Sequence, residues 1–324
     1  MSLPRLLSTV VTIVLTAAMT LLAGGAAGAE AQQAFPRRWA SPETTTVTYG
    51  PFTIPAATQS DGGGHGENGH TGNRVEVDVE KPCENCFITG FEPDLVYADG
   101  STANVNTGPM MHHAVMFRSW TQDLTCPGPQ RIFATGNERV ASTFPDGYGF
   151  KVGLFEEPWN LVFDLMNHAH QEKEVYISFT FTHESALGSD VEPVTPIWLD
   201  VGGCAGSTYT APQGVSEEST QWESTISGEL VHMRGHLHHG GTRIRTENLT
   251  TGQTLCRTEA EEGGTPEFIT PHGHTEISDL PPCSGDTLGS IDEGDVLQTT
   301  SRYELPNHAH DDVMGIMVGW VDQD

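Results

Sequence analysis

Apolar and polar residues alternate along most of this chain, with the period of a β-strand rather than that of a helix. Alternating or β-branched runs occupy residues 74–79, 113–117, 160–166, 174–181, 197–201 and 314–321. Alternation with a period of two places successive side chains on opposite faces of a strand. Turn sequences such as ADGS, PDGYG and EGD separate the runs, and the chain contains 36 Gly and 20 Pro. The pattern therefore predicts an all-β protein built from β-sandwiches.

The first 31 residues differ from the rest. Arg5 precedes an apolar run from Leu6 to Leu22, and the small residues of AGAEA follow it. This order predicts a secretory signal peptide, residues 1–31, that is cut after Ala29 or Ala31. A run of about 17 residues is at the short end for a membrane span, so we expect a secreted, soluble monomer rather than a membrane protein.

The remaining length, about 290 residues, exceeds what one hydrophobic core usually serves, which predicts two domains. Residues 205–222 have the composition of a linker, so we place the domains at 74–205 and 206–324. Residues 32–73 form an N-terminal extension. Its Gly-rich polar insert at 58–73 is expected to be disordered, and its histidines, His65 and His70, to lack a defined geometry.

Charge and cysteine content narrow the class of function. Acidic residues outnumber Lys and Arg by 43 to 15, a net charge of −28, which argues against nucleic acid or an anionic membrane as a partner. Cysteines in an exported chain predict disulfides rather than a zinc site, although Cys83 and Cys86 have half of a zinc motif. We expect Cys256 to pair with Cys283. The six candidates are Cys83, Cys86, Cys126, Cys204, Cys256 and Cys283.

Histidines cluster in the stretch MRGHLHHGG. His236 and His238 are two residues apart, so on a strand both imidazoles lie on one face, where they can bind one ion. His239 then points to the other face. The alternative is a set of ordinary exposed histidines beside a Gly-Gly turn.

Three further clusters make that alternative weaker. MMHHAVMF supplies His112 and His113, which can share an ion only if a bulge or a twisted strand start turns both to one side. LMNHAH and PNHAHDDVMG supply the other two clusters, whose histidines are His168 and His170, and His308 and His310.

The ligand types favour copper. A helical His-Glu-x-x-His of the kind found in zinc hydrolases is absent. A histidine-rich set with a thioether candidate, Met314, and no free thiolate suits an ion that cycles between Cu(I) and Cu(II). The alternative for Met314 is packing in the core.

In combination these stretches resemble a known family. MMHHAVMF, MRGHLHHGG and GDVLQTTSRYELPNHAHDDVMGIMVGW have the order and spacing of the copper type II, ascorbate-dependent monooxygenases, which include peptidylglycine α-hydroxylating monooxygenase and dopamine β-monooxygenase. NERVASTFPDGYGFKVG, with LDVGGC and GHLHHGG, is also similar to plant stress-up-regulated nodulin-like secreted proteins. The resemblance covers most of residues 75–322.

The resemblance implies two tandem jelly-roll β-sandwich domains, each with one copper, that face each other across an open cleft. It assigns the first copper to His112, His113 and His168, with His170 as the alternative to His168. The second copper, which binds O₂ and substrate, takes His236, His238 and Met314. The implied activity is hydroxylation of a C–H bond of a small organic substrate, with ascorbate or a similar compound as reductant.

Two positions bear on the substrate. Arg234 matches an Arg that holds the substrate carboxylate in the peptide-amidating member of the family, although it could equally form a surface salt bridge. Val318 stands where that enzyme has a Tyr, so a glycine-extended peptide is not the expected substrate. The competing hypotheses are a non-catalytic extracellular copper-binding or stress protein on the same scaffold and, more remotely, a zinc-dependent hydrolase.

Overall fold

The computed structural model describes residues 41–58 and 69–323. Every regular element in these ranges is a β-strand except two short 3₁₀ turns, η1 (Val105–Thr107) and η2 (Pro266–Phe268), which confirms the all-β prediction. The predicted signal peptide and His65 lie outside the described residues. No helix in the described ranges is long and apolar enough to cross a membrane.

One long sheet contains strands from both the N-terminal and the C-terminal parts of the sequence. Its main path, in spatial order, is β1 (Glu43–Ile54), β10 (Lys173–Ser185), β4 (Cys86–Val96), β8 (Tyr148–Val152), β11 (Glu192–Asp200), β21 (His310–Gln323), β14 (Gly228–Leu237) and β19 (Cys283–Ile291). Two short strands attach to it, β7 (Ser142–Thr143) to β4 and β12 (Thr208–Ala211) to β21. A brief parallel pairing of β8 with β11 joins the N-terminal strands to the C-terminal ones.

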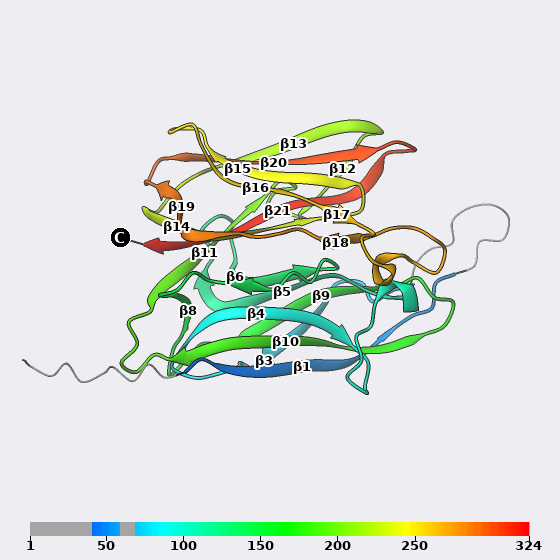
Figure 1. Cartoon of the computed structure of the whole chain (residues 1–324), viewed down its shortest axis with the longest axis horizontal. Helices are drawn as coiled ribbons and strands as arrows, with labels where there is room; N and C mark the ends of the chain where they lie inside the picture. Colours follow the sequence, from blue (N-terminus) through cyan, green and yellow to red (C-terminus); the bar gives the residue numbers. More distant parts are fainter. Residues whose placement is uncertain (1–40, 59–68, 324) are drawn as a thin grey trace, which may run out of the picture. The chain divides into compact units, whose positions relative to one another are not determined.

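Two further sheets cover this long sheet (Figure 1). One consists of β2 (Gly69–His70), β9 (Trp159–Asn167), β5 (Pro109–Gln122) and β6 (Pro129–Gly136), with β3 (Arg74–Val79) also paired to β9. The other consists of β13 (Gly214–Glu223), β20 (Val296–Leu305), β15 (Gly241–Asn248) and β16 (Gln253–Glu259). A small hairpin sheet is formed by β17 (Glu261–Glu262) and β18 (Ile277–Asp279).

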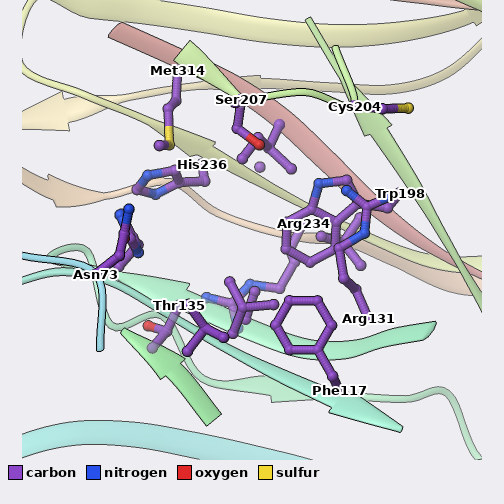
Figure 2. A pocket seen from close by; sticks show the side chains of 18 of the residues that line it. Asn73, Phe117, Arg131, Thr135, Trp198, Cys204, Ser207, Arg234, His236 and Met314 are labelled. Carbon is purple, nitrogen blue, oxygen red and sulfur yellow. The ribbon is translucent and has the colours of Figure 1, made fainter. Parts of the chain in front are cut away.

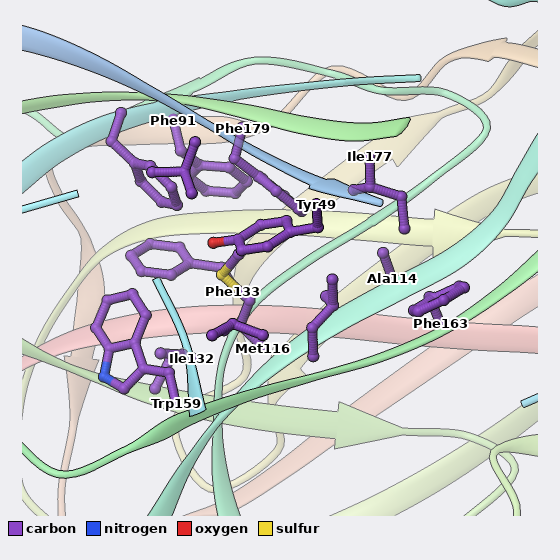
Figure 3. Close-up of a cluster of buried hydrophobic side chains, with 14 of the residues drawn as sticks. Tyr49, Phe91, Ala114, Met116, Ile132, Phe133, Trp159, Phe163, Ile177 and Phe179 are labelled. Atoms are coloured by element: carbon purple, nitrogen blue, oxygen red, sulfur yellow. The ribbon is translucent and has the colours of Figure 1, made fainter. Parts of the chain in front are cut away.

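Alternating apolar side chains form the first of two hydrophobic cores. On β10 every second side chain, from Val175 to Phe181, is buried, and these residues pack against β4, β5 and β9. Phe133 lies among several other aromatic rings, including Phe91 at 4.9 Å and Phe150 at 5.2 Å between ring centroids (Figure 3). Burying a large apolar side chain stabilises a fold by about 1.5–3 kcal/mol, so this cluster is the main support of the N-terminal strands.

Strand β21 is buried on both faces, which explains why MGIMVGWV is an almost unbroken apolar run. Met314, Ile316, Val318 and Trp320 belong to the first core, whereas the intervening residues face a second core beneath the four-stranded sheet. Its partner β14 is buried in the same way, yet its sequence places His232, Arg234 and His236 on the interior. Buried polar residues in such a strand indicate a functional site.

The disulfide prediction is confirmed. Cys83 pairs with Cys86, Cys126 with Cys204, and Cys256 with Cys283, as expected for that last pair. No free cysteine remains. Exported proteins are commonly cross-linked by disulfides, so the three bonds are compatible with an extracellular location.

One local expectation from composition is wrong. Most of the supposed linker 205–222 forms β12 and β13. On β13 the side chains are largely exposed, so a polar sequence there is compatible with a strand at a sheet edge. Residues 59–68 of the Gly-rich insert lie outside the described residues, and Gly69–His70, near its end, form β2, which pairs with β9. Residues 43–54 form β1 in the long sheet, and a domain boundary near residue 206 stays a prediction.

Candidate metal centre

His236, His238 and Met314 come together where β14 and β21 lie side by side. His236 pairs with Ile316 across the two strands, and its ring centroid is 5.2 Å from that of His238. Met314 is 7% exposed, and its sulfur points toward His236 (Figure 2). The structure therefore brings all three predicted ligands of the second copper together.

Hydrogen bonds fix the orientation of both imidazoles. The Nδ1 of His236 lies 3.3 Å from each carboxylate oxygen of Glu138, and the Nδ1 of His238 donates to the carbonyl oxygen of Asp312 at 2.6 Å. The Nε2 atom of each ring is buried and has no hydrogen-bond partner within the described part of the chain. A histidine that donates from one nitrogen and leaves the other bare has the arrangement of a metal ligand.

Gly136 is needed for this arrangement. A Cβ at this position would overlap the imidazole of His236 and the carboxylate of Glu138. The Gly136 backbone N–H also donates to Glu138, at 3.1 Å, so the glycine both makes room for the imidazole and holds its partner.

We therefore expect Gly136→Ala to weaken copper binding about 10–100-fold, the usual effect of disturbing a residue that orients a ligand. The chain should still fold, because the overlap is confined to the metal centre. Copper titration of the variant and of Gly285→Ala, at a position of ordinary backbone conformation where a Cβ meets its neighbours only at van der Waals distance, measures the effect. Equal affinities in the wild type and Gly136→Ala would contradict this role.

His112 and His113, two of the predicted ligands of the first copper, lie on β5 at a bulge. The register of β5 against β9 shifts between Met111 and His113, which provides the irregularity that two adjacent ligands require. Their ring centroids are 5.0 Å apart. Asp164 on β9 completes a group in which one ligating atom from each residue lies within 4.8 Å of the others.

Asp164 also binds a histidine from the Gly-rich segment. Its Oδ2 accepts from the Nδ1 of His112 at 3.2 Å and from the Nδ1 of His70 at 3.3 Å, while Thr71 donates to Oδ1 at 3.1 Å. Burial favours the protonated form of Asp164, but the hydrogen bonds from the two histidines outweigh it and hold the pKa below its usual range. Asp164 is thus an anion beside the histidine pair.

The two predicted ligand sets are in contact. The ring centroids of His112 and His238 are 4.5 Å apart, so four imidazoles form one cluster, His112, His113, His236 and His238. This contact differs from the open cleft that the resemblance implies, because the His112 ring on β5 lies against the His238 ring at the end of β14.

Burial keeps two of these four imidazoles, His113 and His238, neutral. It lowers the pKa of His113 to about 3, with further lowering from the charges of His112 and His236. The pKa of His238 also lies well below its ordinary value, because of burial and then His112 and His236. Neutral imidazoles at pH 7 are the form that binds metal ions.

His168 and His170 are not joined to this cluster by any contact among the described residues. The Nε2 of His168 lies 3.4 Å from the sulfur of Met110, and His170 donates from Nδ1 to the carbonyl oxygen of Ala57 at 3.1 Å. Their role as copper ligands stays a prediction. His239 points away from the cluster to Glu262, 2.5 Å from its Nδ1, as expected for the residue on the opposite face.

His70 and Asp164 are the site residues that sequence reasoning missed. His70 is at the end of a Gly-rich stretch whose composition indicates disorder, so nothing in the sequence marks it. Asp164 gives a clearer signal, since it is the one carboxylate within the apolar strand NLVFDLM.

A cavity of about 450 Å³ lies beside the cluster, between β5 and β6 on one side and β14 and β21 on the other. His236 and Met314 line one end, and Trp198 and Arg131 line the other (Figure 2). The volume is in the range of pockets that hold small organic ligands.

Arg234 lines the same cavity and is 2% exposed. Its Nη1 and Nη2 have no hydrogen-bond partner among the described residues, and its guanidinium lies 5.0 Å from the centre of the Phe91 ring. Burial lowers the pKa of Arg234 to about 10, opposed by the charge of Glu138, so the group stays protonated at pH 7. The alternative of a surface salt bridge is therefore wrong.

Arg131, at the far end of the cavity, is held by Asp123. Its Nε donates to Oδ2 at 2.9 Å and its Nη2 to Oδ1 at 3.0 Å. Burial raises the pKa of Asp123, but the bonds and charge of Arg131 outweigh it and lower the pKa below the ordinary value.

Because this pKa is lowered on folding, the pair stabilises the protein above the pKa of an unfolded Asp, about 4, and the contribution is lost as the pH falls. Asp123→Asn should cost about 3 kcal/mol of unfolding free energy at pH 7, as expected for a buried pair that loses one partner. The difference from the wild type should shrink at pH 3. Urea unfolding at both pH values tests this, and a pH-independent difference would contradict it.

Comparison with known proteins agrees with the histidine pattern. The chain is 26% identical over 295 residues to a probable copper-dependent oxygenase, M1, from Phoma sp., which covers 85% of this chain and 71% of that protein. It is 25% identical over 227 residues to the probable copper-dependent oxygenase clz3 from Cochliobolus lunatus, covering 66% and 70% of the two chains. No family model matches the chain.

Among solved structures, the major capsid protein P2 of bacteriophage PM2 matches with a TM-score of 0.32 and 9% identity, over 87% of this chain and 98% of that one. A likeness this weak carries no argument about function.

Proposed function

We propose that this protein is a copper-dependent monooxygenase that hydroxylates a C–H bond of a small organic substrate held in the cavity. One observation carries the proposal: the Nε2 atoms of His236 and His238 are buried without a hydrogen-bond partner among the described residues, and His236 lines the cavity next to Met314. The similarity to two probable copper-dependent oxygenases supports it.

The donor set fits copper. Two imidazole nitrogens and a thioether, without thiolate, suit an ion that must be stable as both Cu(I) and Cu(II). His236, His238 and Met314 would hold one ion. His112 and His113 would hold the other, and we propose Asp164 as their third partner in place of His168, because it lies against the pair.

Hydroxylation consumes one O₂, two electrons and two protons, and yields the alcohol and one water. Bound copper supplies the one-electron redox chemistry with O₂, and an external reductant of the ascorbate type supplies the electrons. The protein itself contributes the rest: Glu138 and the Asp312 carbonyl orient the ligands, and the apolar walls limit the access of water to the reacting atoms.

We further propose that Arg234 binds an anionic group of the substrate. Its guanidinium is buried, protonated and unpaired among the described residues, so a carboxylate in the cavity would satisfy both bare nitrogens. The opposite end of the substrate would then lie near His236 and Met314. Secretion, expected from the signal sequence and compatible with the three disulfides, belongs to the same proposal, as does a monomeric state.

The test uses the copper-loaded mature protein with ascorbate, ¹⁸O₂ and a panel of small aromatic and aliphatic carboxylates. We expect a product that carries one ¹⁸O atom from O₂, and no such product from the metal-free protein. Copper binding without any ¹⁸O-labelled product would contradict the enzymatic proposal and favour a non-catalytic extracellular copper-binding protein. Preferential zinc binding with hydrolysis would favour the zinc-dependent hydrolase instead.

A further inference from the structure

A second group of metal-binding side chains lies away from the four-imidazole cluster, where the turn after β9 meets the loop between β17 and β18. The turn carries His168 and His170. The loop contributes three residues at alternate positions in the sequence HGHTE, namely His272, His274 and Glu276. The proposed copper chemistry uses none of these residues.

His168 is the centre of this group and is 6% exposed. Its Nε2 lies 3.4 Å from the sulfur of Met110 and 4.0 Å from Oε1 of Glu276. Two ligands of one tetrahedral ion, at metal–ligand distances of about 2.0–2.3 Å, lie about 3.3–3.7 Å apart. The Nε2 of His168 and the carboxylate oxygen of Glu276 thus lie slightly farther apart than two ligands of one ion, and the Met110 sulfur lies next to them.

The remaining imidazoles lie in the same region of the fold. The ring centroids of His170 and His272 are 5.2 Å apart, and His170 donates from Nδ1, which leaves Nε2 for a ligand. His272 and His274 are both close enough for their charges to act on His168.

Both segments have a fixed backbone. The fully buried Asn167 donates to the carbonyl oxygens of Pro55 at 3.0 Å and Gln171 at 2.8 Å, which holds the turn. In the loop, the Thr270 N–H donates to the His274 carbonyl at 2.8 Å, and the Glu276 N–H donates to the Phe268 carbonyl at 2.9 Å. Ligands on a fixed backbone lose little entropy when an ion binds.

We propose that His168, Glu276 and the two loop histidines form a second metal site, separate from the copper centre, that binds a divalent zinc-type cation. Imidazole and carboxylate ligands suit Zn²⁺, and a closed set of four protein ligands is typical of structural rather than catalytic zinc. The ligands come from the turn after β9 and from the C-terminal loop, so the bound ion cross-links segments that are distant in the sequence.

The experiment measures zinc binding and thermal unfolding of the metal-free mature protein in chelator-treated buffer. We expect His272→Ala/His274→Ala and Glu276→Gln each to bind one zinc equivalent fewer than the wild type. The rise in Tm that zinc produces by binding the folded state should be lost in both variants. Because Gln has nearly the shape of Glu, Glu276→Gln separates loss of a ligand from misfolding.

Two control variants make the result specific. His308→Ala/His310→Ala removes a stacked histidine pair elsewhere, and His236→Ala/His238→Ala disables the copper centre; each should keep this zinc equivalent. Unchanged zinc stoichiometry in His272→Ala/His274→Ala would overturn the proposal. It would also be overturned if His168→Ala lost the same metal equivalent as His112→Ala instead of the one lost with His272 and His274.

Discussion

His236→Ala should lower ascorbate-driven oxygenation by more than about 100-fold, beyond the 10–100-fold effect of residues that merely orient a ligand. The substitution removes the buried Nε2 next to Met314 and leaves Glu138 without the imidazole that it orients. One of the two copper equivalents should be lost, because two ligands alone hold copper weakly. Copper analysis and product formation on the same sample measure both effects.

The matched control is His308→Ala, which removes an imidazole that is not part of the cluster. It should keep both copper equivalents and full turnover. Retention of two coppers and of product formation in His236→Ala would show that oxygen chemistry, if present, occurs elsewhere in the chain.

Arg234→Met should make the substrate-free protein more stable while it removes turnover of carboxylate substrates. The guanidinium is buried and two of its nitrogens have no hydrogen-bond partner among the described residues. An unsatisfied buried polar group costs about 1–3 kcal/mol, and the apolar Met does not incur that cost. Met fills much of the same volume beside Phe91. The measurements are the free energy of unfolding by urea and the steady-state kinetics of the copper-loaded variant.

Arg257→Met serves as the control, because Arg257 is an exposed partner of Glu259 and surface pairs contribute about 0–1 kcal/mol. Destabilisation of Arg234→Met by several kcal/mol, with kinetics unchanged, would mean that Arg234 supports the fold and does not bind substrate.

The strands could be predicted from the sequence because their alternation reflects burial directly. Five of the six predicted runs lie within strands of the structure, from β3 to β21, and the sixth, 197–201, extends one residue beyond β11. Strand β13 was missed because it is exposed, so its sequence carries polar turn-like residues and no alternation of apolar ones. Composition identifies a loop only where solvent exposure and disorder coincide.

The ligands of the second copper could be predicted from the sequence better than the residues that pack around them. His236 and His238 share a face because strand geometry fixes that relation, and Met314 follows from the resemblance to a known family. The contact of His112 with His238 depends on how β5 packs over β14, which local sequence does not encode. For the same reason the approach of the HGHTE loop to His168 could not be foreseen.

X-ray absorption at the copper edge of the reduced, copper-loaded protein tests most directly whether His236, His238 and Met314 bind one copper. We expect imidazole nitrogens as the main ligands and one sulfur scatterer per two coppers, which disappears in Met314→Leu. A sulfur-free spectrum of the wild type, or one that Met314→Leu does not change, would contradict the assignment of His236, His238 and Met314 as the oxygen-reactive copper site.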